Sequence, residues 1–184
     1  MTADELARAR RRPVAGELKP RDFMALVKDA AFERLPFEPP KHRIHGSLLQ
    51  MYYFEWPQNY EVSLGVHEHR TDRVRVHLSF AGESEENLRR LALVAEAMPD
   101  VMSSFGMNLD IYERRYSHGQ VRAFVGFTVP RQPLDAAFAA EVGRHLARFI
   151  EVLEPVVGPL GALPWSTLDA REIAKRRARA AGGA

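Results

Sequence analysis

The side chains best suited to chemistry are three histidines near the middle of the chain, His67, His69 and His77. A spacing of two residues puts His67 and His69 on one face of an extended strand, and a neighbouring strand can bring His77 to the same face. Three imidazole nitrogens in that arrangement can hold a zinc ion and leave one position open for water. This segment could therefore serve a small metal-dependent hydrolase.

Arg73 and Arg75 belong to the same predicted face, and they argue against a metal. Their positive charges would repel a cation and attract an anion or an acidic partner. The cluster holds no carboxylate placed as a general base, and exposed sheet faces commonly carry histidine and arginine without a function. We therefore expect a solvated face without a bound metal. An anion- or partner-binding surface is the second interpretation and a metal site the third.

No other motif indicates an enzyme. Glu55 and Glu61 fall on the same face and could act as an acid–base pair if burial separated their pKa values, but the sequence favours two solvated carboxylates. The chain has no cysteine, no glycine-rich phosphate loop, no His-Glu-x-x-His and no Gly-x-Ser-x-Gly. We expect no cofactor, and we favour a protein without catalytic activity.

Positive charge is concentrated at the two ends of the 184-residue chain, whose formal net charge is +2. Residues 1–13 and 169–184 together carry +5, and the residues between them carry −3. These basic arms could neutralise phosphates, although they contain no aromatic side chain on which a base could stack. The candidate nucleic-acid contacts are Arg8, Arg10, Arg11, Arg12, Arg171, Lys175, Arg176, Arg177 and Arg179.

Hydrophobic periodicity and turn residues predict the elements that position these side chains. Three segments with strand character, separated by turn residues, predict an antiparallel meander, and a second hairpin follows a long helix. Pro99 inside that helix predicts a break or kink, and the prolines from Pro155 onward predict the end of the last helix. The expected strands are 48–56, 60–69, 73–81, 109–115 and 120–129, and the expected helices are 20–35, 84–105 and 134–153.

The register of the meander decides which side chains face the helices, because a shift of one residue exchanges the two faces of a strand. We pair Val66 with Val76 and Phe54 with Val62. Leu49, Met51 and Tyr53 then join the histidines on the outer face, which a partner, a second copy or the arms would cover. The predicted core face carries Leu48, Tyr52, Val62, Leu64, Val66, Val74, Val76, Leu78 and Phe80, with Ile111 opposite Val125 in the second hairpin.

The expected fold is therefore α+β, with two layers: a five-stranded antiparallel sheet with helices on one face, in the order α-βββ-α-ββ-α. Short basic helices are expected at both ends. We divide the chain into a basic arm and linker (1–19), a single α+β domain (20–157) and a linker with a basic C-terminal helix (158–184). The order of elements resembles the secretion-chaperone-like fold.

Three short segments resemble a small domain of unknown function that occurs beside nuclease-like domains in restriction-associated bacterial proteins. They are residues 60–64 (YEVSL), 73–78 (RVRVHL) and 149–155 (FIEVLEP), and the resemblance spans about 48–157. The matches are hydrophobic patterns, so they imply no catalytic residue. Nothing in the chain resembles a nuclease domain.

The leading functional interpretation is a non-enzymatic interaction module that binds a protein partner or a second copy through the outer sheet face. A nucleic-acid-associated accessory protein that uses the basic arms is the alternative. No segment approaches the ~20 apolar residues of a membrane span, and no signal sequence is evident, so we expect a cytoplasmic protein without membrane contact.

Overall fold

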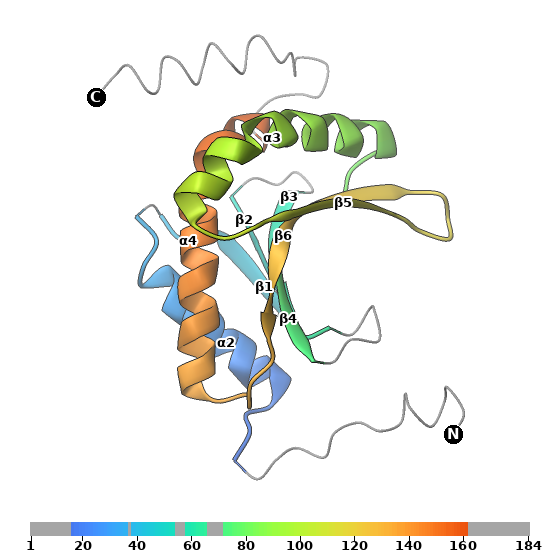
Figure 1. Cartoon of the computed structure of the whole chain (residues 1–184). Helices are drawn as coiled ribbons and strands as arrows, with labels where there is room; N and C mark the ends of the chain where they lie inside the picture. The colour runs from blue at the N-terminus through green and yellow to red at the C-terminus, as the bar shows by residue number, and fades with distance from the viewer. Residues whose placement is uncertain (1–15, 37, 54–57, 66–71, 162–184) are drawn as a thin grey trace.

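The computed structural model describes residues 16–36, 38–53, 58–65 and 72–161. Three helices and six strands make up this part of the chain, and the six strands form one antiparallel sheet in the order β1-β2-β3-β4-β6-β5 (Figure 1). The elements are α2 (Pro20–Phe32), β1 (Lys41–His45), β2 (Leu48–Tyr52), β3 (Gln58–Ser63), β4 (Arg73–Phe80), α3 (Ser84–Phe105), β5 (Asp110–Arg115), β6 (Val121–Pro130) and α4 (Ala136–Gly161).

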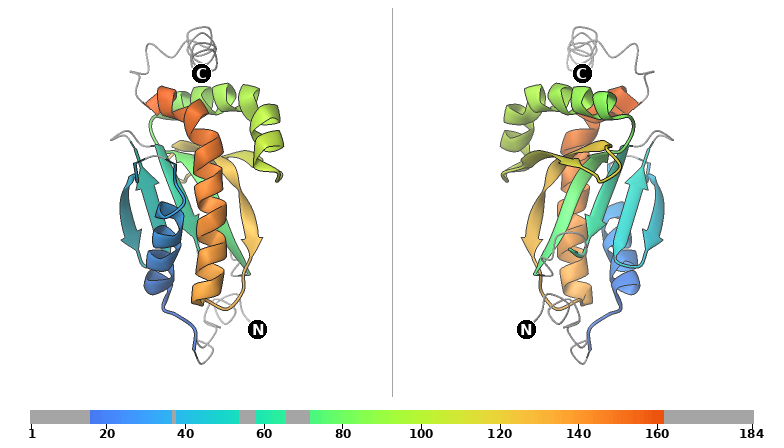
Figure 2. Two further views of the ribbon diagram at one scale, coloured as in Figure 1. Left: turned by 90° about the vertical axis from the view of Figure 1, so that its left-hand side faces the viewer. Right: turned by 90° about the vertical axis from the view of Figure 1, so that its right-hand side faces the viewer.

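Helices α2 and α4 lie side by side over one face of the sheet, and α3 packs against β6 and α4 (Figure 2). The α2–α4 crossing is close because Gly143 has no side chain. A Cβ at this position would lie 2.7 Å from the Cβ of Ala30 and 2.7 Å from the carbonyl oxygen of Val27. In the right-hand view of Figure 2 the strands lie in front of α4, and no described helix covers this outer face.

The α+β class, the antiparallel sheet and the three helices agree with the prediction, but the sheet has six strands and not five. The additional strand is β1, with the sequence KHRIH, which pairs with β2 at the edge of the sheet. Its one apolar residue, Ile44, gives no alternation of apolar and polar residues. A hydrophobic pattern therefore could not reveal this strand.

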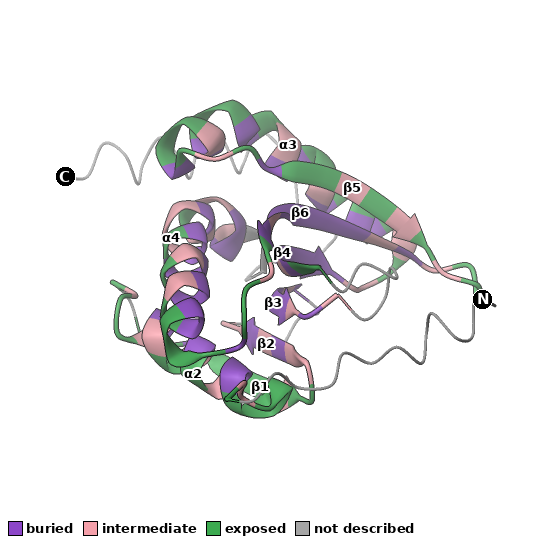
Figure 3. Cartoon of the chain, turned by 60° about the horizontal axis from the view of Figure 1, so that its bottom comes forward, coloured by how far each residue is buried: buried purple, intermediate pink, exposed green. Residues whose placement is uncertain are grey.

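The central strands β3, β4 and β6 carry most of the buried positions of the sheet (Figure 3). Val62 pairs with Val76, whereas the predicted partner of Val76 was Val66. A shift by four residues keeps every side chain on its predicted face. Val62, Leu64, Val76 and Leu78 are accordingly buried in the core, none of them more than 4% exposed.

The predicted pairing of β2 with β3 is wrong, and the error exchanges the two faces of β2. Leu49, not Phe54, pairs with Val62, a shift of five residues. Leu49 and Met51 are therefore fully buried beneath the helices, and Leu48 lies on the outer face. Tyr53 is half-buried and packs against the same core. The apolar outer surface expected from these three residues does not exist.

Helix α3 has the predicted bounds. The three- and four-residue spacing of its apolar residues, Leu88 among them, predicts their burial, but Leu88 is 38% exposed, and Asn87 and Arg90 are buried. The polar contacts of Asn87 explain this orientation of the helix, since its side chain donates hydrogen bonds to the carbonyl oxygens of Gly82 and Val121. The helix continues through Pro99 without a break and bends along its course (Figure 1).

Helix α4 also continues through prolines that were expected to end it. Pro155 and Pro159 lie inside the helix, which turns near its C-terminal end (Figure 2). Each proline removes one N–H donor from the helix. Burial of Leu153 and Val157, together with a hydrogen bond of 3.2 Å from Gln58 Nε2 to the Val157 carbonyl oxygen, holds this segment on the sheet.

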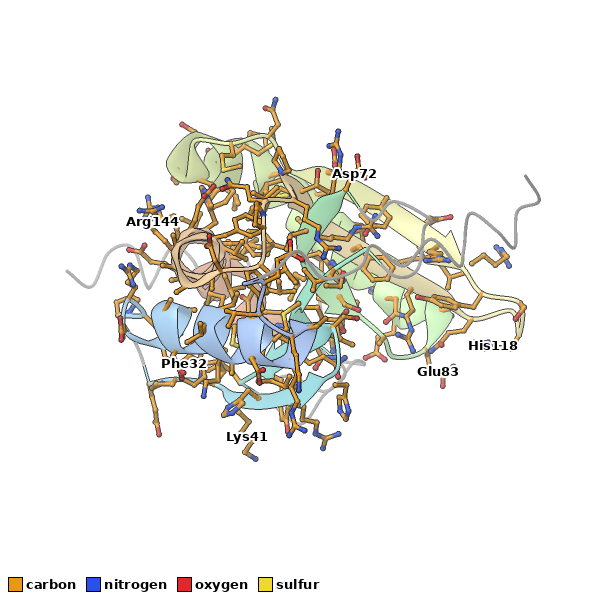
Figure 4. All side chains as sticks on the ribbon, turned by 90° about the horizontal axis from the view of Figure 1, so that it is seen from below. Phe32, Lys41, Asp72, Glu83, His118 and Arg144 are labelled. Atoms are coloured by element: carbon orange, nitrogen blue, oxygen red, sulfur yellow. The ribbon has the colours of Figure 1, made fainter. Side chains whose placement is uncertain are left out.

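The β5–β6 hairpin has the predicted register, with Ile111 opposite Val125. Gly119 adopts a φ of 89° in the connecting turn, and His118 lies at the tip of the hairpin (Figure 4). Val125 is buried, whereas Ile111 lies on the edge strand and is 39% exposed. The hairpin therefore places alternate side chains of β5 and β6 on the outer face beside those of β4.

Candidate functional site

A cleft of about 290 Å³ lies on the outer face of the sheet, opposite α2 and α4. Its walls are alternate side chains of five neighbouring strands, because residues separated by two positions share one face. Four of them are arginines, and we refer to the site as the arginine cleft. The lining residues are Leu48, Gln50, Glu61, Ser63, Gly65, Arg73, Arg75, His77, Asp110, Tyr112, Arg114, Tyr116, Arg122, Phe124 and Thr128.

Glu61 and His77 form the floor of the arginine cleft. They are opposite each other on β3 and β4, and His77 Nε2 lies 2.9 Å from Glu61 Oε2. The other carboxylate oxygen, Oε1, accepts a hydrogen bond of 2.8 Å from Gln50 Nε2. Glu61 is 8% exposed and His77 5% exposed, so this pair is buried, contrary to the prediction of a solvated carboxylate.

The contacts of Glu61 stabilise its charged form. Burial alone would raise the pKa of this carboxyl. The hydrogen bond from His77 and the charge of that ring, the bond from Gln50 and the positive charge of Arg122 outweigh burial and lower the pKa below 4.5. Glu61 is therefore a carboxylate at neutral pH, and each of its oxygens already accepts a hydrogen bond.

The ring of His77 fits into the sheet because its cross-strand neighbour is Gly126. A Cβ at Gly126 would lie 2.5 Å from the Cβ of His77. The imidazole packs edge-on against Phe124, with ring centroids 5.2 Å apart. The second ring nitrogen, Nδ1, is buried and has no hydrogen-bond partner, so no serine of the described part of the chain is joined to the Glu61–His77 pair as in a nucleophilic triad.

Guanidinium groups cover the aromatic rings of the arginine cleft. The Cζ atom of Arg75 lies 5.7 Å from the ring centroid of Tyr112, and Tyr112 stacks on Phe124 with ring centroids 5.0 Å apart. Arg122 lies 5.0 Å and Arg114 5.4 Å from the centroid of Tyr116. Such cation–π contacts fix the orientation of each guanidinium group. They also occupy ring faces on which a nucleic-acid base could otherwise stack.

The described lining residues of the arginine cleft carry an excess of positive charge. Four arginines stand against two carboxylates, Glu61 and Asp110. Arg73 donates a hydrogen bond of 3.1 Å to Thr128, which holds its side chain at the rim. The Nε–H group of Arg122 is buried and donates no hydrogen bond within the described chain. The cleft therefore combines net positive charge with oriented guanidinium donors.

Three of the predicted anion- or partner-binding residues, Arg73, Arg75 and His77, meet in this cleft. His67 and His69 lie outside the described residues, as do all nine basic residues of the two arms. Among the described residues, no group of three or more histidines and carboxylates could hold a metal ion, and no helix is long and apolar enough to cross a membrane.

The sequence interpretation missed the contribution of the second hairpin to the site. Arg114, Arg122 and Tyr112 come from β5 and β6, and the correctly predicted pairing of Ile111 with Val125 places all three on the opposite face from that pair. The alternation of side chains along the hairpin therefore already assigned these three residues to the outer face. The sequence did not reveal that β4 pairs with β6, which joins the two hairpins into one surface.

A second polar cluster lies on the core side of the sheet, where the C-terminal part of α4 crosses β3. Tyr60 donates a hydrogen bond of 2.6 Å to Glu154 Oε2. Burial raises the pKa of Glu154 from 4.5 to about 7, although the bond from Tyr60 favours the charged form. Burial and the neighbouring carboxyl also raise the pKa of Tyr60. Glu154 is thus poised to change its charge near neutral pH.

No protein-family model and no curated protein matches this chain. Among solved structures, the fold is similar to the crystal structure of YbjN from E. coli, described as a putative transcription regulator. The TM-score is 0.37 with 9% sequence identity, over 68% of this chain and 87% of that chain. A likeness of this degree carries no argument about function, and the resemblance to a restriction-associated domain stays a prediction.

Proposed function

We propose that this protein is a non-enzymatic interaction module that binds an acidic segment of a partner protein in the arginine cleft. The observation that carries the proposal is the meeting of Arg73, Arg75, Arg114 and Arg122 from three neighbouring strands around one hollow with only two carboxylates. Clustered positive charge accelerates and orients the docking of acidic surfaces.

The internal contacts of the cleft favour an external ligand. Glu61 lies on the floor of the cleft, and its two carboxylate oxygens already accept hydrogen bonds from Gln50 and His77. The arginines also need little reordering on binding, because rings and Thr128 already orient them. A preorganised guanidinium group loses less conformational entropy when it meets a carboxylate.

A charge-reversal experiment on the full-length protein tests this proposal. We expect a fluorescent glutamate-rich peptide to bind, a glutamine-rich peptide of the same length not to bind, and affinity to fall as salt rises. Arg75→Glu and Arg114→Glu should each weaken binding by about tenfold or more, a change of ~1.4 kcal/mol. The matched control is Arg144→Glu, on the helical side of the molecule (Figure 4).

Equal binding by the two cleft variants and the control would place the acidic segment elsewhere and reject the proposal. Circular dichroism of each variant must show an unchanged fold for the comparison to hold. A single-stranded oligonucleotide belongs in the same titration. If it binds more tightly than the peptide and competes with it, the cleft serves nucleic acid, which was the alternative interpretation of the sequence.

A further inference from the structure

We infer that the anion received by the arginine cleft is a phosphate monoester, carried on a phosphorylated side chain of the partner; the inference rests on the function proposed above. The net charge of the cleft matches that of a phosphate monoester. Four arginines and two carboxylates leave an excess of two positive charges among the described lining residues. A phosphate monoester carries a charge of about −1.5 to −2 at neutral pH, whereas a glutamate carries only one negative charge.

The hydrogen-bond donors of the cleft also suit a phosphate. Arginine matches phosphate because its planar fork can donate two parallel hydrogen bonds to adjacent oxygens. Arg122 lines the cleft with a buried Nε that has no hydrogen-bond partner in the described chain. The Nδ1 of His77, which also lines the cleft, is buried without a hydrogen-bond partner as well. Buried polar groups of this kind normally have a partner.

The size of the cleft and the contacts of its aromatic rings favour a single phosphorylated side chain over a nucleic acid. A hollow of about 290 Å³ is at the lower end of the range for small-molecule sites and suits one phosphorylated side chain. The rings of Tyr112 and Tyr116 already contact guanidinium groups, and Tyr112 also stacks on Phe124. Recognition of a single-stranded nucleic acid relies on free aromatic faces. The geometry therefore favours a phosphoprotein over a nucleic acid.

Four peptides that differ at one position test the inference with the full-length protein. The position carries phosphoserine, O-sulfoserine, glutamate or serine, and binding is measured by calorimetry at about pH 7.5. The sulfate ester has the shape of the phosphate with one negative charge fewer, so it separates charge from shape. We expect the phosphopeptide to bind about tenfold or more tightly than the sulfated and glutamate peptides, and inorganic phosphate to compete with it.

The preference should depend on the cleft. Arg122→Gln should reduce the ratio of phosphopeptide to glutamate-peptide affinity to about threefold or less, and Arg144→Gln should leave it unchanged. If Arg122→Gln does not fold, Arg73→Gln at the exposed rim takes its place. Retention of the full preference in these cleft variants would overturn the assignment.

The outcomes separate this inference from the proposed function. Equal affinity for the phosphorylated and glutamate peptides would overturn the phosphate assignment and leave an acidic-segment module in place. No binding of any acidic peptide would reject the proposed function itself. An oligonucleotide that displaces the phosphopeptide and binds more tightly would also overturn the inference, because the cleft would then recognise phosphodiesters.

Discussion

Glu154 should make the stability of this protein fall as pH rises through neutrality. The pKa of this carboxyl is raised from 4.5 to about 7 by burial between α4 and β3. A group whose folded pKa is raised contributes stability that is fully present below pH 4.5 and lost as pH rises through about 7. The groups that face Glu154 are Tyr60, which donates a hydrogen bond to it, and Tyr53, whose own pKa is raised by burial and by the Glu154 carboxyl.

The size of the effect follows from the two pKa values. At 1.36 kcal/mol per pKa unit, the difference corresponds to about 3 kcal/mol, and partial contact of the carboxyl with solvent reduces this to ~2 kcal/mol. Glu154→Gln removes the titration and keeps the shape of the protonated side chain. The wild type should therefore lose about 2 kcal/mol of unfolding free energy relative to Glu154→Gln between pH 5 and pH 8.5.

Urea unfolding followed by circular dichroism at several pH values measures this difference. Comparison with Glu154→Gln cancels other titrating groups, including Glu61, whose lowered pKa acts in the opposite direction. Tyr60→Phe supplies a second check, because loss of its hydrogen bond to the carboxylate should move the transition to higher pH. Parallel stability profiles of wild type and Glu154→Gln would show that Glu154 does not titrate near neutrality in the folded protein.

Two further predictions concern packing. Leu49→Ala should destabilise the fold by ~2–5 kcal/mol, because it leaves a cavity at a fully buried site, and Leu48→Ala on the outer face should destabilise it clearly less. Equal effects of the two variants in urea unfolding would contradict the β2–β3 register. Gly143→Ala should lower the melting temperature, because the added Cβ would lie 2.7 Å from the Val27 carbonyl oxygen and 2.7 Å from the Ala30 Cβ. An unchanged melting temperature would show that α2 and α4 can separate freely.

The local pattern of apolar and turn residues predicted much of this fold. The parts it failed to predict depend on how strands joined by longer loops pair. The bounds of α3 and the pairing of Ile111 with Val125 follow from periodicity and a short turn. The face of Leu49 depends on a loop length between β2 and β3 that periodicity cannot give. An error of five residues there exchanged the two faces of β2 and created a false apolar patch.

The candidate site was predictable to a similar degree. Arg73, Arg75 and His77 were assigned to the outer face because parity along β4 alone decides it. Burial of Glu61 could not be predicted, since it results from Gln50, His77 and Arg122 meeting from three other strands. The run of α4 through Pro155 depends likewise on a tertiary contact, the hydrogen bond from Gln58 to the Val157 carbonyl. Local propensity does not contain that information.

Mapping the surface on which an acidic phosphopeptide binds shows whether the arginine cleft is its site. Backbone amide chemical shifts of the full-length protein can be recorded during a titration with the peptide. The largest changes should cluster on the cleft strands, at residues 48–50, 61–63, 73–77, 110–116 and 122–128. Amides of 20–32 and 136–150, in α2 and α4 behind the sheet, should change little. Shift changes concentrated on the helices, or confined to 1–15 and 162–184, would contradict binding in the arginine cleft.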